Sequence, residues 1–387
     1  FVKSRLPDVD IAAGTEDWST PASNEWYLVF GTGPHGSEAL SKGLSDQTAK
    51  VKMLNLKTLG TTGALAITDI STSDTLSSVG DLQTVDWDRD LIDDVVYFGT
   101  AAWDTTNIRH TGNLKRLKLA STLTSSTVNN FVAAEHPIVA APLTALGGDN
   151  KRWVMVGTGK LHVADDNDIS DQQYFFSAFE PKENDNTYNY TDAINNPSTE
   201  FEDTTDVRIF ADGTITNTSG GVVSIGGNTI NSLTDMKNEI AANKKGWYVR
   251  LELDGTNPSG RVTHQATLDP ANRGFMAYTE YQPPGGVCEL DGESYLWELS
   301  YEAGISGQFA PLGHDTITPQ NSGEIASAPK QSIGKGQASK VVFHQGTGGN
   351  LVAITNLSTG AIEGTTVATE NPGYGRQSWQ QIDMSNF

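Results

Sequence analysis

Asp86-Trp87-Asp88-Arg89-Asp90-Leu91-Ile92-Asp93-Asp94 leads directly into Val95-Val96-Tyr97-Phe98-Gly99-Thr100. The second part of this stretch is an unbroken run of β-branched and aromatic residues that ends at a glycine, which is typical of a buried β-strand. The first part is an acidic loop, and the strand anchors one of its ends. The stretch therefore predicts a β protein in which a charged loop is held beside the core.

The acidic loop has the spacing of a calcium-binding loop. Aspartates stand at positions 1, 3, 5 and 9 of nine residues, so that their side chains can converge on one point. Ca²⁺ takes six to eight oxygen ligands, at about 2.3–2.6 Å, from carboxylates, backbone carbonyls and water. We therefore predict a Ca²⁺ site whose ligands are the side chains of Asp86, Asp88, Asp90 and Asp94 and the backbone carbonyl of Ile92.

The alternative interpretation of the loop is a solvated acidic turn. Carboxylates this close together repel one another, and a hydrophobic strand follows them, so we favour the metal site. The loop differs from an EF-hand, which has glycine at position 6 and a bidentate glutamate at position 12. Here these positions hold Leu91 and Tyr97. We expect a short Ca²⁺ loop that leads into a strand.

The composition limits the possible functions. The 387 residues include 47 Asp and Glu against 26 Lys and Arg, which gives a net charge of −21. This charge argues against non-specific binding to nucleic acid or to anionic membranes. No apolar run approaches the roughly 20 residues of a membrane-spanning helix. The chain starts at Phe1 without an initiator methionine or a signal peptide, so we interpret it as a mature or excised part of a longer protein.

A short signature recurs at the ends of predicted strands. It reads Phe30-Gly31-Thr32, Phe98-Gly99-Thr100 and Val156-Gly157-Thr158, with a looser copy near Met276. Further strands with alternating apolar residues follow several copies, for example residues 114–119. We predict an all-β, quinoprotein-like β-propeller with irregular blades and long insertions between strands. The number of blades stays open, and a closed ring would use residues upstream of Phe1.

We treat residues 1–387 as one propeller-like domain with an insertion at about 181–245. The insertion is rich in Asn, Asp and Thr and then becomes helical. Ser232-Leu233-Thr234-Asp235 resembles a capping box, which predicts a helix over 233–243. Gly246 is expected to stop this helix, and the strand pattern resumes at Trp247.

Other candidate sites are weaker. Gly31-Thr32-Gly33-Pro34-His35-Gly36 matches a dinucleotide-binding motif, but no crossover helix follows, so we interpret it as a strand-end turn. The seven histidines lack zinc spacing. His162 precedes Asp165, Asp166 and Asp168, which we expect to form an acidic surface turn. Cys288, the single cysteine, is expected to be a structural thiol or a half-cystine whose partner lies elsewhere.

Taken together, these segments resemble the C-terminal domain of PilY-type type IV pilus tip adhesins. The family's D-x-D-x-D/N-x-x-x-D-x-x-Y-x-G segment matches the stretch from Asp86 to Gly99. Lys245-Gly246-Trp247-Tyr248-Val249 and Ser294-Tyr295-Leu296-Trp297-Glu298-Leu299 resemble two family strands, and the likeness covers roughly residues 20–305. Leu91 departs from the glycine often found in the family's loop.

The resemblance implies a calcium-binding propeller without enzymatic activity. It implies a cell-surface location at the pilus tip, reached through the periplasm, and a role in pilus biogenesis, adhesion and twitching motility. The implied partners are minor pilins or other tip components and a host or abiotic surface. The implied metal ligands are Asp86, Asp88, Asp90, Asp94 and the carbonyl of Ile92.

Two other functions stay open on the same fold. One is a quinone-dependent dehydrogenase, although a single cysteine and no evident quinone pocket argue against it. The other is a surface lectin that binds carbohydrate through one or two of the eight tryptophans.

Overall fold

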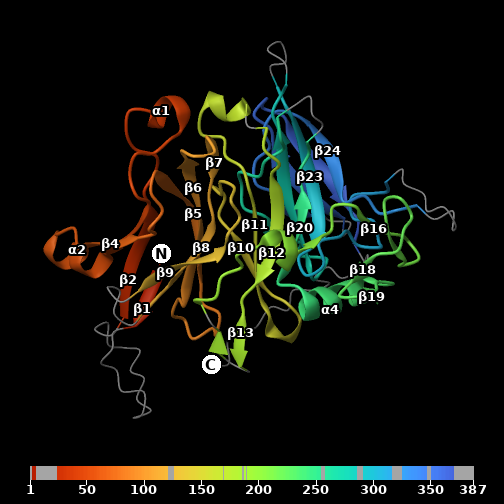
Figure 1. The fold of residues 1–387 in the computed structure, drawn as a ribbon, viewed down its shortest axis with the longest axis horizontal. Helices are drawn as coiled ribbons and strands as arrows, with labels where there is room; N and C mark the ends of the chain where they lie inside the picture. Colours follow the sequence, from red (N-terminus) through yellow and green to blue (C-terminus); the bar gives the residue numbers. More distant parts are fainter. Residues whose placement is uncertain are drawn as a thin grey trace, which may run out of the picture.

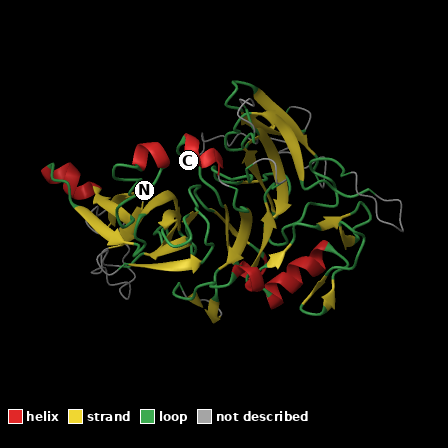
Figure 2. Ribbon diagram, turned by 45° about the horizontal axis from the view of Figure 1, so that its top comes forward, coloured by secondary structure: helices red, strands yellow, loops and turns green. Residues whose placement is uncertain are grey.

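The structure is a computed structural model that describes residues 2–5, 24–120, 126–168, 170–184, 187–188, 190–253, 258–285, 291–315, 325–346 and 350–369. Cys288 lies outside these residues. Strands dominate the described chain, and helices are few and short (Figure 2). The predicted all-β fold is confirmed. Five sheets of three or more strands form in the described residues, and they follow one another in chain order across the molecule (Figure 1).

The first two sheets are built from the N-terminal part of the chain. The first has the order β1-β2-β3-β4, and the second has the order β5-β6-β8-β9 with β7 paired to β6. Their strands are β1 (Val2–Arg5), β2 (Asn24–Gly31), β3 (Lys50–Asn55), β4 (Ile67–Ser71), β5 (Ser77–Val85), β6 (Val95–Asp104), β7 (Arg109–Thr111), β8 (Leu114–Lys118) and β9 (Thr127–Val132).

The third, fourth and fifth sheets follow with the orders β10-β11-β12-β20-β15, β21-β22-β23-β24 and β25-β26-β27. Their strands are β10 (Leu143–Leu146), β11 (Arg152–Gly157), β12 (Tyr174–Phe179), β15 (Glu202–Asp203), β20 (Gly246–Arg250), β21 (Thr267–Leu268), β22 (Phe275–Gln282), β23 (Glu293–Ser300), β24 (Lys330–Lys335), β25 (Val342–Gln345), β26 (Leu351–Asn356) and β27 (Ile362–Val367). Four antiparallel strands in chain order are the unit of a propeller blade.

A long excursion separates β12 from β20, although these two strands are neighbours in the third sheet. It contains small elements, whose bounds are β13 (Lys182–Asn184), β14 (Thr187–Tyr188), α3 (Pro197–Glu200), β16 (Val207–Ile209), β17 (Ile215–Asn217), β18 (Ser224–Ile225), β19 (Asn228–Thr229) and α4 (Leu233–Asn243). The predicted helix is confirmed, and the Ser232 side chain caps it by accepting a hydrogen bond from the Asp235 N–H. The helix ends before Lys244, so Gly246 does not stop it and instead begins β20.

The remaining helical segments are short. They are α1 (Ala39–Lys42), α2 (Leu56–Thr62), η3 (Gly148–Asn150) and η4 (Ala164–Asp168). The four residues of α1 follow the glycine motif that ends β2, and they are too few for the crossover helix of a dinucleotide fold. The interpretation of this motif as a strand-end turn is therefore confirmed.

Each hydrophobic cluster joins one sheet to the next. Along β6, Val96 and Phe98 pack toward the first sheet, whereas Val95 and Tyr97 pack toward the third. Successive side chains of a strand point to opposite faces, so an apolar run such as this one is buried on both sides. Similar clusters join the third sheet to the fourth and the fourth to the fifth.

The expected half-buried alternation of residues 114–119 is wrong for β8. Leu114, Lys115, Arg116 and Leu117 are all buried, because both faces of β8 are covered: Leu117 packs toward the first sheet and Leu114 toward the third. The two basic side chains are tolerated there because each one meets an acidic partner, which is the usual condition for burying a charge.

The recurring signature marks the contacts between sheets. A Cβ atom added to Gly31 would lie 2.4 Å from a side-chain atom of Val79, one added to Gly99 would lie 2.2 Å from Ile138, and one added to Gly157 would lie 2.3 Å from Val262. Real Cβ atoms do not come this close to other atoms. The glycines are therefore needed because a β-branched residue from a later part of the chain packs directly on the backbone.

The threonine after each glycine completes the same contact. The carbonyl of Thr32 accepts a hydrogen bond from Val79 N–H (2.8 Å). Those of Thr100 and Thr158 accept from Ile138 and Val262, each at 3.0 Å. The β-branched residue that rests on the glycine is thus also hydrogen-bonded to the threonine. We call this repeated arrangement the glycine–threonine contact.

Replacement of Gly157 by alanine tests the importance of this contact. The new methyl group would overlap the fully buried Val262, and overpacking of this kind costs about 1–3 kcal/mol. We expect the free energy of unfolding, measured by urea denaturation, to fall by that amount. Gly33→Ala is the matched control, because no atom lies within 4 Å of its added Cβ. Equal stability of the two variants would contradict this role for the signature.

Candidate metal centre

The acidic loop connects the first two strands of the second sheet. Val85 at the end of β5 pairs with Val95 at the start of β6, so residues 86–94 form the turn of a hairpin. The Asp94 N–H also donates to the Val85 carbonyl at 2.9 Å, which closes the base of the loop. Because Val95 and the three residues after it are fully buried, the carboxylates are attached to a rigid strand.

Three of the predicted ligands meet in space. One carboxylate oxygen from each of Asp86, Asp88 and Asp94 lies within 4.8 Å of the other two. Oxygens that share one Ca²⁺ at about 2.3–2.6 Å are separated by no more than about 5 Å. Asp88 is exposed and the other two are half-buried, so the group lies at the surface where a cation can reach it. In the described residues, this is the one group of three or more acidic, histidine or cysteine side chains arranged so closely.

Asp90 and Ile92 are placed differently from these three. The side chain of Asp90 is not a member of the close group, and its Oδ1 accepts a hydrogen bond from the Ile92 N–H at 2.8 Å. The ligand roles predicted for Asp90 and for the Ile92 carbonyl therefore remain predictions.

The loop turns sharply without glycine. Arg89 and Leu91 have φ angles of 65° and 70°, in the left-handed region that non-glycine residues rarely adopt. The Asp86 carboxylate stabilises this backbone by accepting hydrogen bonds from Arg89 N–H (2.6 Å), Asp90 N–H (3.2 Å) and Leu91 N–H (2.8 Å). Leu91 thus takes, at position 6 of the loop, a conformation for which an EF-hand uses glycine.

The environment of the carboxylates raises two of their pKa values. Partial burial raises the pKa of Asp94, and the neighbouring charges of Asp88 and Asp86 raise it further. The pKa of Asp88 is raised by burial and by Asp90 and Asp86. Like charges held together disfavour ionisation, whereas a bound cation favours it. The charge of Arg152 lowers the pKa of Asp94 in turn, so protein groups offset part of the mutual repulsion of the carboxylates.

A buried polar network supports the loop from below. The Trp87 N–H donates to Asp94 Oδ2 at 2.8 Å, and its indole Nε1–H donates to the Tyr97 hydroxyl at 3.2 Å. Tyr97 in turn donates to Glu180 Oε1 at 2.6 Å, and Glu180 forms a fully buried salt bridge with Arg116. The loop is thus connected through two aromatic side chains to an ion pair in the core.

Each of the three guanidinium nitrogens of Arg116 donates a hydrogen bond. Besides Glu180, it donates to the carbonyls of Tyr190 and Asp192, and its guanidinium lies 4.9 Å from the centre of the Phe131 ring. Burial raises the pKa of Glu180 to about 7, against the opposing influence of Arg116 and Tyr97. Neither Arg116 nor Glu180 was singled out from the sequence, because their separation along the chain gives no sign of their contact.

The acidic segment near His162 contradicts one expectation. Asp166 is fully buried, and its Oδ1 lies 2.7 Å from Nζ of the equally buried Lys160. Its Oδ2 accepts hydrogen bonds from the N–H groups of His162 and Val163. The predicted surface turn is therefore wrong for Asp166, because a buried lysine neutralises it, although Asp165 is exposed as expected.

Tyr97→Phe tests the network under the loop. The change removes one hydroxyl and leaves both the Trp87 indole N–H and a Glu180 oxygen without that partner in the core. Each unsatisfied buried group costs about 1–3 kcal/mol. We therefore expect the free energy of unfolding, measured by urea denaturation, to fall by at least the cost of one such group, about 1–3 kcal/mol. Tyr281→Phe, at a half-buried tyrosine of β22, is the control. A Tyr97→Phe protein as stable as the control would show that the network contributes nothing.

Comparisons with known proteins bear on the fold. No protein-family model matches the sequence, and no curated protein matches it. Among solved structures, the C-terminal domain of PilY1 from Pseudomonas aeruginosa is similar, with a TM-score of 0.56 and 13% identity over 96% of this chain and 71% of that chain.

Two further structures are more distant in fold. They are a GH93 α-L-arabinofuranosidase of Fusarium graminearum in complex with arabinobiose (TM-score 0.31, 10% identity, 94% of this chain and 85% of that one) and an endo-arabinase from Bacteroides thetaiotaomicron (TM-score 0.27, 7% identity, 90% and 93%). The likeness to the PilY1 domain shows that the chain has a PilY1-like, β-propeller-like fold.

Proposed function

We propose that this chain is a calcium-binding propeller domain of a protein associated with type IV pili. The observation that supports calcium most directly is the convergence of Asp86, Asp88 and Asp94 on a rigid hairpin. The pilus association is supported by the PilY1-like fold.

In this proposal, Asp86, Asp88 and Asp94 hold the ion, and Asp90 and the Ile92 carbonyl complete its oxygen shell. The bound ion supplies positive charge that neutralises the carboxylates. The protein supplies the preformed turn, through the hydrogen bonds that Asp86 accepts from the loop backbone. A cation that binds only the ordered loop shifts the population toward that form. Calcium would therefore stabilise the ordered form of this surface loop.

The proposal places the protein outside the cell, at the pilus tip, after export through the periplasm. Its partners would be minor pilins or other tip components, together with a host or abiotic surface. The role is binding rather than catalysis, in support of pilus biogenesis, adhesion and twitching motility. No helix among the described residues is long and apolar enough to cross a membrane.

Calorimetric titration of Ca²⁺ into chelator-treated protein tests the metal site. We expect one binding event, which is lost when Asp86 and Asp94 are both replaced by alanine. The single change Asp88→Asn removes one charged ligand and should weaken binding by about tenfold or more, since ligand charge sets the affinity of such sites.

Asp81→Asn is the matched control for this titration, because Asp81 is an exposed carboxylate on β5 that lies outside the close group. It should bind Ca²⁺ like the wild type. Absence of binding in the wild type would contradict the metal site and favour the interpretation of the loop as a solvated acidic turn. Binding that survives the double replacement would place the ion elsewhere.

The pilus association has a separate test. Pili are sheared from the organism that produces this chain and probed with an antibody against it. We expect the protein in the sheared fraction, and we expect it to disappear from that fraction in a strain without the major pilin. Detection in the cytoplasmic fraction alone would contradict the proposal.

A further inference from the structure

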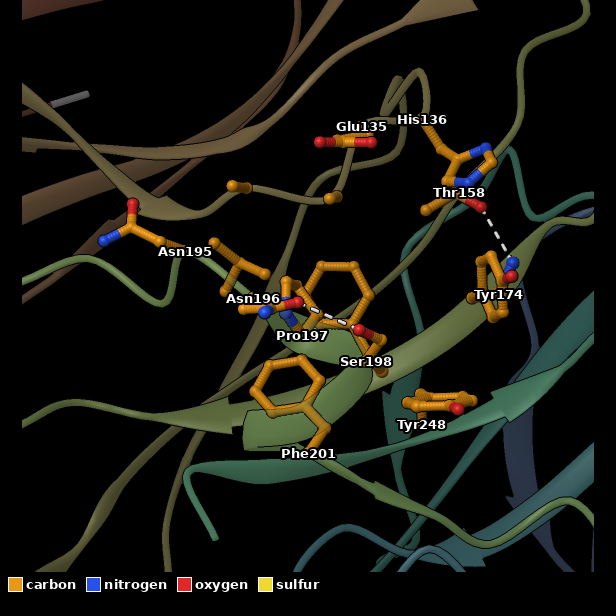
Figure 3. A pocket seen from close by; sticks show the side chains of 14 residues that line it. Glu135, His136, Thr158, Tyr174, Asn195, Asn196, Pro197, Ser198, Phe201 and Tyr248 are labelled. Carbon is orange, nitrogen blue, oxygen red and sulfur yellow. Dashed lines mark hydrogen bonds between the residues drawn. The ribbon is translucent and has the colours of Figure 1, made fainter.

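A cavity of about 220 Å³ lies between the second and third sheets, apart from the acidic loop of residues 86–94 (Figure 3). Sites for drug-sized ligands begin at roughly 300 Å³, so this space suits a ligand of a single ring. The side chains that matter for its chemistry are those of Glu135, His136, Tyr174, Asn195, Ser198 and Tyr248.

The backbone around the cavity is fixed by two parallel β-bridges. Val132 pairs with Ile194 on one side, and Ile138 pairs with Gly159 on the other. Hydrogen bonds from Ala133 N–H to the Ile194 carbonyl (2.9 Å) and from Gly159 N–H to the Pro137 carbonyl (2.7 Å) reinforce them. Residues 133–136, in the segment between the bridges, form one wall. The cavity is therefore built into the junction of the two sheets.

The floor of the cavity is aromatic. Tyr174 and Phe176 are two residues apart on β12 and point to the same face, and Tyr248 of β20 lies directly opposite Phe176. The rings of Tyr174 and Tyr248 are nearly perpendicular (87°), with centroids 5.5 Å apart. Phe176 is buried, as is Phe201 beside it, whereas both tyrosines are half-buried. The two tyrosines thus present ring surface to a ligand.

The rim of the cavity is polar and exposed. Asn195, Asn196 and Ser198 stand where α3 begins, and Ser198 Oγ donates to Asn196 Oδ1 at 2.9 Å. Glu135 stands on the opposite wall with a φ angle of 57°, which turns the backbone there (Figure 3). Amide and hydroxyl groups offer both donors and acceptors.

The cavity carries little net charge. Glu135 is the one carboxylate among the lining residues, and its Oε2 lies 3.4 Å from Nη2 of Arg109. Burial lowers the pKa of His136, and the nearby Arg109 lowers it further, so this imidazole is neutral at pH 7. A neutral ligand fits this environment better than an ion.

We propose that this cavity binds one neutral sugar ring. The apolar C–H face of a pyranose packs on an aromatic surface, and its hydroxyls both donate and accept hydrogen bonds, as the rim groups do. An organic cation would also pack on aromatic faces, but the lining carboxylate, Glu135, is already paired with Arg109. The inference rests on the cavity alone and is independent of the calcium loop.

Saturation-transfer NMR on the purified chain tests this proposal with four free sugars: D-glucose, D-galactose, D-mannose and N-acetyl-D-glucosamine. We expect at least one to bind saturably, with a dissociation constant on the order of millimolar, as for other ligands of this size. Tyr174→Ala removes a ring from the floor, and Asn195→Ala removes a polar group from the exposed rim. Each should weaken binding, the former by about tenfold or more, by loss of its packing surface.

Trp26→Ala is the matched control, because Trp26 is a half-exposed aromatic residue on β2 that does not line the cavity. It should leave binding unchanged. Asn195 is exposed, so its replacement reports on binding even if Tyr174→Ala misfolds. The proposal is overturned if none of the four sugars saturates, if both cavity variants bind like the wild type, or if tetramethylammonium binds more tightly than every sugar. The signal comes from sugar protons. A chain that does not bind Ca²⁺ can therefore still show sugar binding, so the two proposals can fail separately.

Discussion

The architecture depends on the close approach of one sheet to the next at three glycines. At each of them, a valine or isoleucine from a later segment lies on the bare backbone and donates its N–H to the carbonyl of the following threonine. The contact combines dense packing with a directional hydrogen bond, so it fixes the separation between the strand that ends at each glycine and the later segment that packs on it. The hydrophobic clusters between the sheets then fill the space that this geometry leaves.

The predictable features were those encoded by neighbouring residues. The glycine–threonine signature, the strand that follows the acidic loop and the capped helix α4 all depend on local spacing, and each appears in the structure at the expected place. The convergence of Asp86, Asp88 and Asp94 is local for the same reason. The sequence could not show that Leu91 would adopt a left-handed backbone, since that depends on the hydrogen bonds accepted by Asp86.

The features that escaped prediction all depend on topology. In the sequence, Arg116 has the pattern of a solvent-facing strand residue, but the third sheet covers its face of β8 and Glu180, directly after β12, pairs with it. The sequence around Asp166 predicts a surface residue, whereas in the structure Asp166 is buried in a salt bridge with Lys160. Likewise, Tyr174 and Tyr248 form one aromatic floor only because β12 and β20 are neighbours. Charge and hydropathy patterns predict the burial of apolar runs well. They fail to predict the burial of polar residues whose partner is distant in sequence.

The separation of β12 and β20 has a consequence for folding kinetics. Strands β10, β11 and β12 are linked by connections within one sheet, whereas β20 joins them only after the chain has passed through α3 and α4. Contacts between distant residues form slowly, because loop closure costs entropy before the contact is gained. Met236 and Ile240 of α4 belong to the same buried cluster as Trp247 of β20, so the insertion must collapse before that strand can dock stably. The third blade should therefore be completed late, at a time set by the insertion rather than by the blade's own hairpins.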